Sequence, residues 1–328
     1  MNFDYNEEQQ LLADSVRRFL QKDYDFEARK KILASPEGWS ERVWSTFAEM
    51  GLTGLPLSPD YGGFGGGAVD LMSVMEAFGE ALVVEPYLPT ILAALVIAKG
   101  GDAKQKQAIL PQVAEGKMRL ALATSERGVI GAPMADKVVF ARGNAVTVGK
   151  PTIVKSYRTV DDLAAADIRL EKGEPLGAAS KAVVDEVLDF GTALSCAEAV
   201  GAMKFACDTT LEYLKTRKQF GVPIGAFQAL QHRMVDMFIA YEQAKSMACL
   251  ACSRTDSHEN AADRARAVSA AKIKIADSAR YISQESVQLH GGMGMSEELK
   301  VSHTFRRLTV LTRRFGDADH HLARFASL

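Results

Sequence analysis

Two short segments in the second half of the chain carry residue types that suit a phosphate-bearing ligand. One begins at Arg217 and reads Arg-Lys-Gln-Phe-Gly, and the other begins at Gln288 and reads Gln-Leu-His-Gly-Gly. A guanidinium at a helix end can pair with a pyrophosphate through two parallel hydrogen bonds, which an ammonium cannot do. Gly291 and Gly292 allow a backbone to approach a phosphate or a ribose closely. The chemistry that these segments could perform is the binding and orientation of a nucleotide-like group.

Other side chains in these segments could contact the uncharged parts of such a ligand. Gln228 and Gln288 offer neutral donors and acceptors for a ribose or an adenine, and Phe220 offers an aromatic face. Each feature also has an ordinary structural interpretation. Arg217 can be a solvated helix end, residues 291–294 can be a helix C-cap and turn, and Gln228 can be a surface cap. Single residues leave these alternatives open.

Histidine and cysteine residues give no sign of metal or acid–base chemistry. His290, His320 and His321 are predicted to be surface or interface residues. Cys249 and Cys252 have C-x-x-C spacing, but a zinc site needs two more ligands at similar spacing and none is evident. Because this pair falls in an alanine-rich helical pattern, we expect two buried small residues and no metal site.

The elements that must position these residues fall into three stretches. Residues 1–117 read mainly as helices, with a glycine-rich loop at 59–67. Residues 118–179 carry short β-branched runs separated by Gly, Asn and Pro, which predict a reduced middle β domain. Residues 180–328 read as long apolar-striped helices with short connections. The expected fold is mainly α with a small β section: an N-terminal helical domain, a truncated middle β domain and a C-terminal four-helix bundle.

Periodicity and caps place the individual elements. Helices are predicted at 41–50, 70–82, 88–99, 105–114, 182–216, 226–254, 261–290 and 297–313, with a further one starting after Asn6 and a short one from Asp317. Strands are predicted at 120–124, 138–141, 145–148, 152–155 and 166–170.

Composition excludes several classes of partner. The 328 residues are 47% hydrophobic and 24% charged, with a formal net charge of −2. Nothing therefore suggests a nucleic acid or an anionic membrane as a partner. No apolar run is long enough to predict a transmembrane helix. The acidic N-terminus lacks a basic region followed by an apolar one, so we expect a cytoplasmic protein.

Taken together, the two segments resemble the flavin-binding signatures of the acyl-CoA dehydrogenase family. Met50-Gly-Leu-Thr-Gly-Leu-Pro and Asp60-Tyr-Gly-Gly-Phe-Gly resemble its N-terminal helix and loop, and residues 101–117 resemble its entry into the β domain. These motifs occur in the family's order and cover nearly the whole chain. The resemblance implies FAD as cofactor, an acyl-CoA substrate, and flavin contacts that reach across a subunit interface. The residues that it assigns to FAD are Arg217, Gln219, Phe220, Gln228, Gln288, Gly291, Gly292 and Ser125.

The middle stretch departs from the pattern of that family. There, a Thr-Glu-Pro-x-x-Gly-Ser loop and a Trp-Ile-Thr strand hold the flavin ring. Here the loop begins at Thr124, and Ser125 and Glu126 keep the register, but Arg127 replaces the proline. Both tryptophans lie far upstream of this stretch. The chain's own pocket for the flavin ring is therefore expected to be incomplete.

The catalytic base departs from the pattern as well. The family's reaction removes an α-proton from an acyl-CoA thioester while a hydride leaves the β-carbon for flavin N5, so it needs a carboxylate near the α-carbon. The resemblance places Phe315, before Gly316, where most members carry that glutamate, and the alternative position falls near Gly191. A phenylalanine cannot take a proton. Asp317 and Asp319 are the candidate substitutes, and a solvated acidic turn is their structural interpretation.

A short chain with a reduced β domain and no base resembles one half of the heteromeric acyl-CoA dehydrogenases. Those pair two different subunits as α2β2 tetramers, often in bacterial steroid catabolism. The resemblance implies a subunit that contributes to an FAD site at an interface while a partner supplies the carboxylate. A steroid-derived acyl-CoA and an electron-transfer flavoprotein are the expected substrate and acceptor. Two alternatives stay open: a self-sufficient homo-oligomer with Asp317 or Asp319 as base, and a catalytically silent scaffold.

Overall fold

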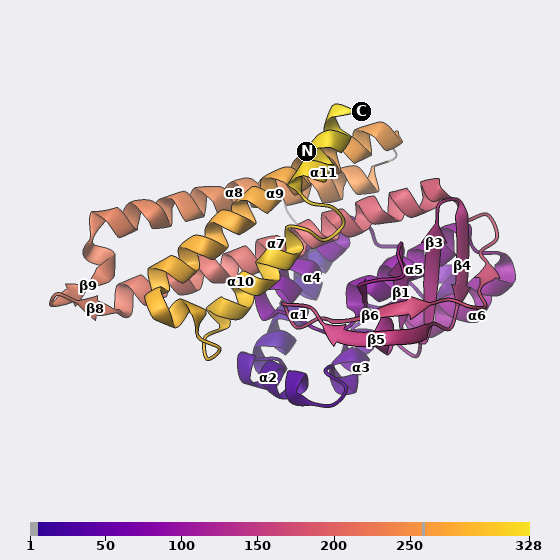
Figure 1. Cartoon of the computed structure of the whole chain (residues 1–328), viewed down its shortest axis with the longest axis horizontal. Coiled ribbons are helices and arrows are strands. Elements are labelled where there is room, and N and C mark those ends of the chain that lie inside the picture. The colour runs from indigo at the N-terminus through magenta and orange to yellow at the C-terminus, as the bar shows by residue number, and fades with distance from the viewer. Residues whose placement is uncertain (1–5, 258–259) are drawn as a thin grey trace. The chain divides into compact units, whose positions relative to one another are not determined.

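Helices make up most of the chain, and a small β section lies between them in sequence (Figure 1). The computed structural model describes residues 6–257 and 260–328. Contacts within the chain divide it into two units. Met1–Ala28, Ala68–Val83 and Thr192–Leu328 form the first unit, and Arg29–Gly67 and Val84–Gly191 form the second. The mainly α fold with a small β section is confirmed, whereas the division into domains at 117 and 179 stays a prediction.

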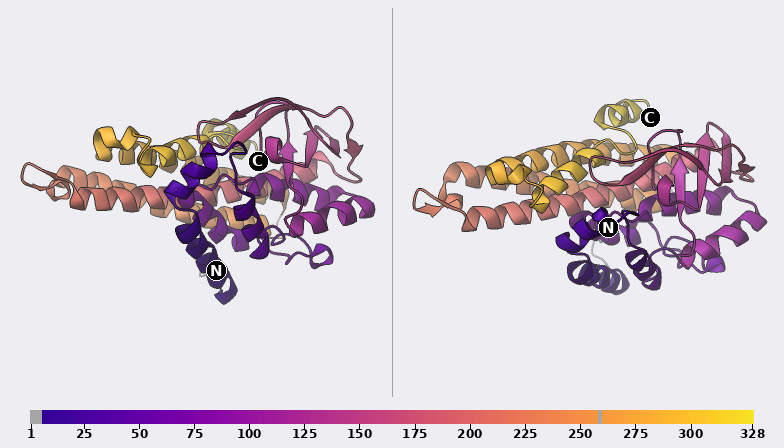
Figure 2. Two further views of the ribbon diagram at one scale, coloured as in Figure 1. Left: turned by 90° about the horizontal axis from the view of Figure 1, so that it is seen from below. Right: turned by 60° about the horizontal axis from the view of Figure 1, so that its bottom comes forward.

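The first unit is built from long helices. They are α1 (Glu7–Asp23), α4 (Ala68–Ala81), α7 (Lys181–Thr216) from Thr192 on, α8 (Gln228–Asp256), α9 (Ala261–His290), α10 (Lys300–Leu311) and α11 (Ala318–Ala326), with the strands β8 (Lys218–Gln219) and β9 (Val222–Pro223). Helices α8 and α9 run side by side in Figures 1 and 2. Met203, Met237, Ile282 and Leu308 bring α7 to α10 into one buried cluster. The predicted bounds of these four helices agree with the structure to within one helical turn.

Side-chain caps fix where several of these helices begin. Asn6 starts α1 with a capping box, in which its side chain accepts from the backbone N–H of Gln9. Asn260 starts α9 in the same way by accepting from Asp263 N. Such caps satisfy backbone donors that have no partner within the helix. Asp256, at the end of α8, accepts from Ala68 N at 2.6 Å and Val69 N at 2.8 Å, so it fastens α8 to the start of α4.

Helices α4 and α7 approach each other closely at two glycines. A Cβ added at Gly201 would lie 1.8 Å from the carbonyl oxygen of Glu76, and one added at Gly79 would lie 1.8 Å from that of Glu198. No real contact is that short, so the two backbones touch directly, and each helix supplies one glycine to the crossing.

Replacing Gly201 with alanine is therefore expected to destabilise the protein by about 2 kcal/mol, because the helices must move apart to admit the methyl group. Urea unfolding followed by circular dichroism measures the change. The matched control is Gly292→Ala, where an added Cβ would meet nothing within 4 Å. Equal stability of the two variants would contradict the close crossing.

The second unit holds the β section. Its elements are α2 (Phe26–Ala34) from Arg29 on, α3 (Glu41–Glu49), η1 (Pro59–Tyr61), α5 (Tyr87–Gly100), α6 (Ala103–Ala114), β1 (Leu120–Ala123), β2 (Val129–Ile130), η2 (Ala132–Met134), β3 (Lys137–Arg142), β4 (Ala145–Gly149), β5 (Thr152–Arg158), β6 (Ala164–Arg169), β7 (Glu174–Pro175) and α7 up to Gly191. The strands form two small sheets, in the orders β1-β3-β4-β7 and β2-β6-β5, and only β1 and β3 pair in parallel. All five predicted strands are present, but sequence patterns did not predict α2, β2 or β7.

Candidate functional site

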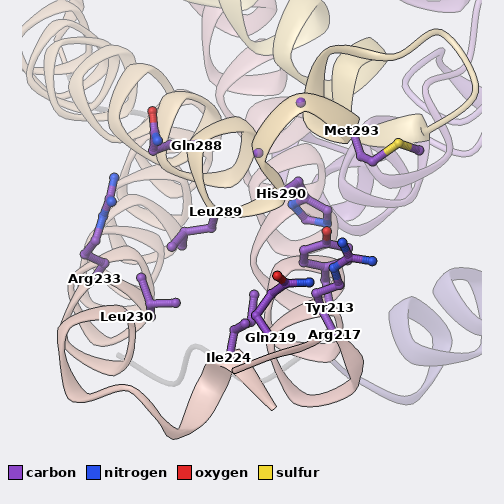
Figure 3. Close-up of a pocket in the computed structure, with 12 residues that line it drawn as sticks. Tyr213, Arg217, Gln219, Ile224, Leu230, Arg233, Gln288, Leu289, His290 and Met293 are labelled. Atoms are coloured by element: carbon purple, nitrogen blue, oxygen red, sulfur yellow. The ribbon is translucent and has the colours of Figure 1, made fainter. Parts of the chain in front are cut away.

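A pocket of about 530 Å³ lies within the first unit, where α7 and α9 both end (Figure 3). It is lined by Tyr213, Arg217, Gln219, Ile224, Leu230, Arg233, Gln288, Leu289, His290, Gly291, Gly292 and Met293. Five of the residues predicted from the two sequence segments are among them. The fold thus brings together the segments at 217 and 288, which are far apart in sequence.

Arg217 is held by its backbone and leaves its side chain available. It follows the last residue of α7, where its N–H donates to Tyr213 O at 2.8 Å and its carbonyl accepts from Ile224 N at 2.8 Å. The side chain is exposed, and within the described residues no hydrogen bond or ion pair engages its guanidinium. A cation on a fixed backbone at a pocket rim is suited to binding an anion.

The end of α9 offers an accessible backbone to the same pocket. Helix α9 ends at His290, and Gly291 follows with φ of 60° and ψ of −146°. A Cβ added at Gly291 or Gly292 would meet nothing within 4 Å, so open space adjoins this backbone. A ligand can therefore approach these peptide groups without meeting a side chain.

His290 is buried, and the prediction of a surface or interface position was wrong. It is only 3% exposed, its Nδ1–H donates to Ser286 O at 2.8 Å, and its ring stacks on Tyr213 at 4.4 Å. Burial lowers the pKa of His290, which keeps the ring neutral. A carbonyl one turn back on the same helix satisfies Nδ1, which explains how a histidine is tolerated inside.

Arg233, on another part of the pocket wall, makes an ion pair that was not foreseen from the sequence, and its partner Glu285 is not itself a lining residue. Arg233 on α8 donates through Nε to Glu285 Oε2 on α9 at 2.6 Å. The only sequence signal was spacing: Glu285 stands three residues before Gln288, so the two side chains share a helix face.

Three predicted residues do not line this pocket. Phe220 lies at the tip of the β8–β9 hairpin, 91% exposed, with a φ of 53°. Gln228 is the exposed first residue of α8. Ser125 belongs to the other unit, in the exposed connection after β1, where its hydroxyl donates to Arg127 O at 2.8 Å. Their assignment to a cofactor stays a prediction.

The turn after α10 carries Phe315, and basic side chains from two helices hold its carbonyls. Phe315 has a φ of 62°, in the left-handed region that non-glycine residues rarely adopt. The buried His321 of α11 donates from Nε2 to Phe315 O at 3.1 Å, and its Nδ1 accepts from the Ser269 hydroxyl at 3.2 Å. Lys272 of α9 donates to Leu311 O at the end of α10. Burial lowers the pKa of Lys272 to about 8.

His321, like His290, was predicted to lie at the surface or an interface, and it is 1% exposed. The hydroxyl of Ser269 and the carbonyl of Phe315 supply the partners that its two ring nitrogens need inside. His320 is exposed as predicted.

Stability is expected to fall by about 2 kcal/mol between pH 7 and pH 5 because of His321. Burial lowers the pKa of its imidazole from 6.5 to about 4 in the folded chain. The unfolded chain therefore binds the proton first as the pH falls, and the folded state loses stability over this window. Urea unfolding at several pH values measures the slope, and His321→Gln is expected to flatten it. His320→Gln, an exposed neighbour, serves as control; an unchanged slope in His321→Gln would contradict the assignment.

The two aspartates proposed as substitute bases stand in the first turn of α11. Asp317 is its N-cap and accepts from His320 N at 2.9 Å, and that hydrogen bond lowers the pKa of the carboxyl. A lower pKa makes it a weaker base, and the carboxylate is already engaged in capping. Asp319 is exposed in the same turn. Neither observation favours a catalytic role.

The described residues show no metal-binding group. Within residues 6–257 and 260–328, no three His, Cys, Asp or Glu side chains are grouped so that they could hold a metal ion. Cys252 is fully buried as predicted, whereas Cys249 is only partly buried. In the same part of the chain, no helix is long and apolar enough to cross a membrane.

Residues 6–117 match the model of the acyl-CoA dehydrogenase N-terminal domain, and residues 181–327 match that of its C-terminal domain. The chain belongs to the acyl-CoA dehydrogenase family, whose members are oxidoreductases that act on acyl-CoA thioesters with FAD as cofactor.

Relatives agree with this placement over the full length. Acyl-CoA dehydrogenase IpdE2 of Mycobacterium tuberculosis is 31% identical over 303 residues, which cover 92% of this chain and 91% of that protein. Among solved structures, the ChsE4–ChsE5 complex from Mycobacterium tuberculosis has a TM-score of 0.89 at 21% identity, covering all of this chain and 98% of that one. The Tcur3481–Tcur3483 steroid ACAD has a TM-score of 0.88 at 24% identity, covering 98% and 97%. The two structures show the same fold.

Proposed function

We propose that this chain is one subunit of a heteromeric FAD-dependent acyl-CoA dehydrogenase. In this proposal it completes an FAD site at a subunit interface, and a different chain supplies the catalytic carboxylate. The observation that carries the proposal is a contrast within one unit. The pocket has an available guanidinium at Arg217, whereas the position that the family resemblance assigns to the catalytic glutamate holds Phe315.

The residues of the pocket fit the ADP half of FAD. Arg217 would pair with the pyrophosphate, and the backbone at Gly291 and Gly292 allows close approach of the same group. Gln219 and Gln288 would offer donors and acceptors to ribose or adenine. Phe220 and Gln228, exposed and outside the pocket, would make their contacts only in the assembled interface. FAD supplies the hydride acceptor of the reaction when it is bound.

The α-proton of the substrate requires a base from elsewhere. Phe315 has no group that can accept a proton, and Asp317 is engaged as a helix cap. A carboxylate of the second chain would therefore remove this proton. Two structures with this fold support the pairing of unlike subunits: the ChsE4–ChsE5 complex and the Tcur3481–Tcur3483 protein.

The proposed substrate and electron acceptor are supported by three similar proteins. One of them is described as a steroid ACAD, which supports a steroid-derived acyl-CoA as substrate. Another structure with this fold is that of an electron transferring flavoprotein of Acidaminococcus fermentans, and one relative is subunit CarC of a caffeyl-CoA reductase–Etf complex, which supports such a flavoprotein as acceptor.

The test is to purify this chain alone and together with a second acyl-CoA dehydrogenase-like chain encoded beside it. We expect little or no flavin in the lone chain and stoichiometric FAD, with turnover, in the complex. Visible absorbance and acyl-CoA oxidation with an artificial electron acceptor measure both. Stoichiometric FAD together with turnover in the lone chain would sink the proposal and favour a self-sufficient enzyme.

A further inference from the structure

One wall of the pocket carries a cation whose charge is already balanced. Glu285 of α9, with 18% of its side chain exposed, binds Arg233 of α8, with 37% exposed. The bond uses Nε of Arg233, and within the described residues no other hydrogen bond or ion pair engages either side chain. The terminal amino groups of Arg233 and the second oxygen of Glu285 therefore keep hydrogen-bonding capacity.

The charge at Arg217 is not balanced in this way, so the two arginines of the pocket differ. Arg217 offers a full positive charge, whereas the Arg233–Glu285 pair is neutral overall but rich in donors and acceptors. Figure 3 shows Arg217 beside Gln219 and Tyr213, with Arg233 drawn apart from them on the other side of the pocket. Gln288, one helical turn after Glu285, adds a neutral amide to the wall with Arg233.

This division matches the charge distribution of an adenosine diphosphate group. The diphosphate is anionic and suits Arg217, while the ribose hydroxyls are neutral and suit a donor–acceptor pair. A carboxylate that accepts from ribose hydroxyls is also how a dinucleotide fold discriminates against a phosphorylated ribose, for which an arginine is used instead. Here Arg233 lines the pocket and is already paired with Glu285, so its charge is neutralised and it does not favour an additional phosphate.

We infer that the Arg233–Glu285 pair selects nucleotides with unmodified ribose hydroxyls and rejects those with a ribose phosphate. The inference rests on the proposed function, because it takes this pocket as the site for the ADP half of FAD. An acyl-CoA dehydrogenase meets two ligands that contain ADP. The ADP half of FAD has free ribose hydroxyls, whereas that of coenzyme A carries a 3′-phosphate with about two negative charges. The pair thus keeps the nucleotide of the substrate out of the cofactor site.

The experiment compares how well two nucleotides compete with FAD for the apo form of the two-chain complex, followed by flavin absorbance. The probes are ADP and 3′-phosphoadenosine 5′-diphosphate, the nucleotide half of coenzyme A. In the wild-type complex, ADP is expected to compete about tenfold more strongly than 3′-phosphoadenosine 5′-diphosphate. Glu285→Gln keeps the size and removes the charge, so Arg233 becomes available to the 3′-phosphate. In that variant the preference is expected to vanish or reverse, while the affinity for ADP changes by less than about threefold.

Two further variants make the result decisive. Arg233→Gln leaves the Glu285 carboxylate without its cation, so this variant is expected to prefer ADP more strongly than the wild type does. The same variant tests the inference if Glu285→Gln fails to fold. Glu242→Gln makes the same charge change at an exposed position of α8 outside the pocket and is expected to leave the preference unchanged. If the preference for ADP is unchanged in both Glu285→Gln and Arg233→Gln, the inferred selection is wrong, and the proposed FAD site is not affected. Failure of ADP to compete in a wild-type complex that binds FAD also overturns it, whereas a wild-type complex that binds no FAD would contradict the proposed function.

Discussion

Replacing Arg217 with alanine in the two-chain complex is expected to weaken FAD binding by about 100-fold, which corresponds to roughly 3 kcal/mol. Arg217 brings an unbalanced charge to the pocket rim, and charge-assisted hydrogen bonds to a pyrophosphate are among the strongest polar contacts. No described residue is placed as its partner, so its removal leaves no buried group without a bond. The loss should therefore fall on the cofactor and not on the fold.

The measurement is the FAD that stays bound after dialysis, together with a titration of the apo complex. Arg217→Lys keeps the charge but loses the two parallel bonds, so an intermediate affinity is expected. Arg280→Ala is the control, because Arg280 is an exposed arginine of α9 that pairs with Asp277 and does not line the pocket. Full retention of FAD in Arg217→Ala would instead support a scaffold that takes no part in flavin binding.

The largest loss of stability is expected for Glu198→Gln, about 3–5 kcal/mol. Glu198 on α7 is 4% exposed and accepts from Arg307 Nη1 at 2.7 Å and from Arg314 Nη1 at 3.0 Å. Arg307 also donates to Val83 O, so it ties α7 and α10 to the segment that follows α4. Neutralising the carboxylate removes a negative charge that these two guanidiniums share in a largely buried setting, so less of the cost of burying them is offset.

Urea unfolding of Glu198→Gln and of Glu212→Gln separates this effect from the loss of any carboxylate. Glu212 lies on the same helix, is exposed and pairs with Lys215, so its replacement should cost less than about 1 kcal/mol. A loss below about 1 kcal/mol in Glu198→Gln would mean that the carboxylate contributes no more than a surface charge does.

The site residues that could be predicted from the sequence are those whose location depends on their spacing along one short segment of the chain. Arg217, Gln219, Gln288 and the two glycines stand at helix ends, where exposure and an open backbone follow from position along the chain. The Arg233–Glu285 pair could not be predicted, because it joins residues 52 apart on two helices. Its existence depends on the register between α8 and α9, which no pattern within either helix specifies.

The two histidine errors have a related cause. His290 and His321 are ionisable, so an exposed position was the simplest expectation. Both are buried because carbonyls or hydroxyls complete their hydrogen bonds: Ser286 O for one, Phe315 O and the Ser269 hydroxyl for the other. Ser269 is far from His321 in sequence, and the contact arises only when α11 packs on α9. Fold class was easier, since helix period and β-branched runs are repeated over many residues.

The left-handed turn at Phe315 is held by contacts of the backbone and does not depend on the chemistry of the side chain at that position. The strain of a φ of 62° is borne by the backbone, and it is similar for phenylalanine and for glutamate, since neither is β-branched. Lys272 and His321 hold carbonyls of this segment and do not depend on the side chain at 315. Under the proposed function, phenylalanine in place of a glutamate at this position would therefore need no change of architecture. If the proposed function holds, two related chains would divide binding and proton removal through one exchange of the side chain at position 315, which these hydrogen bonds do not involve.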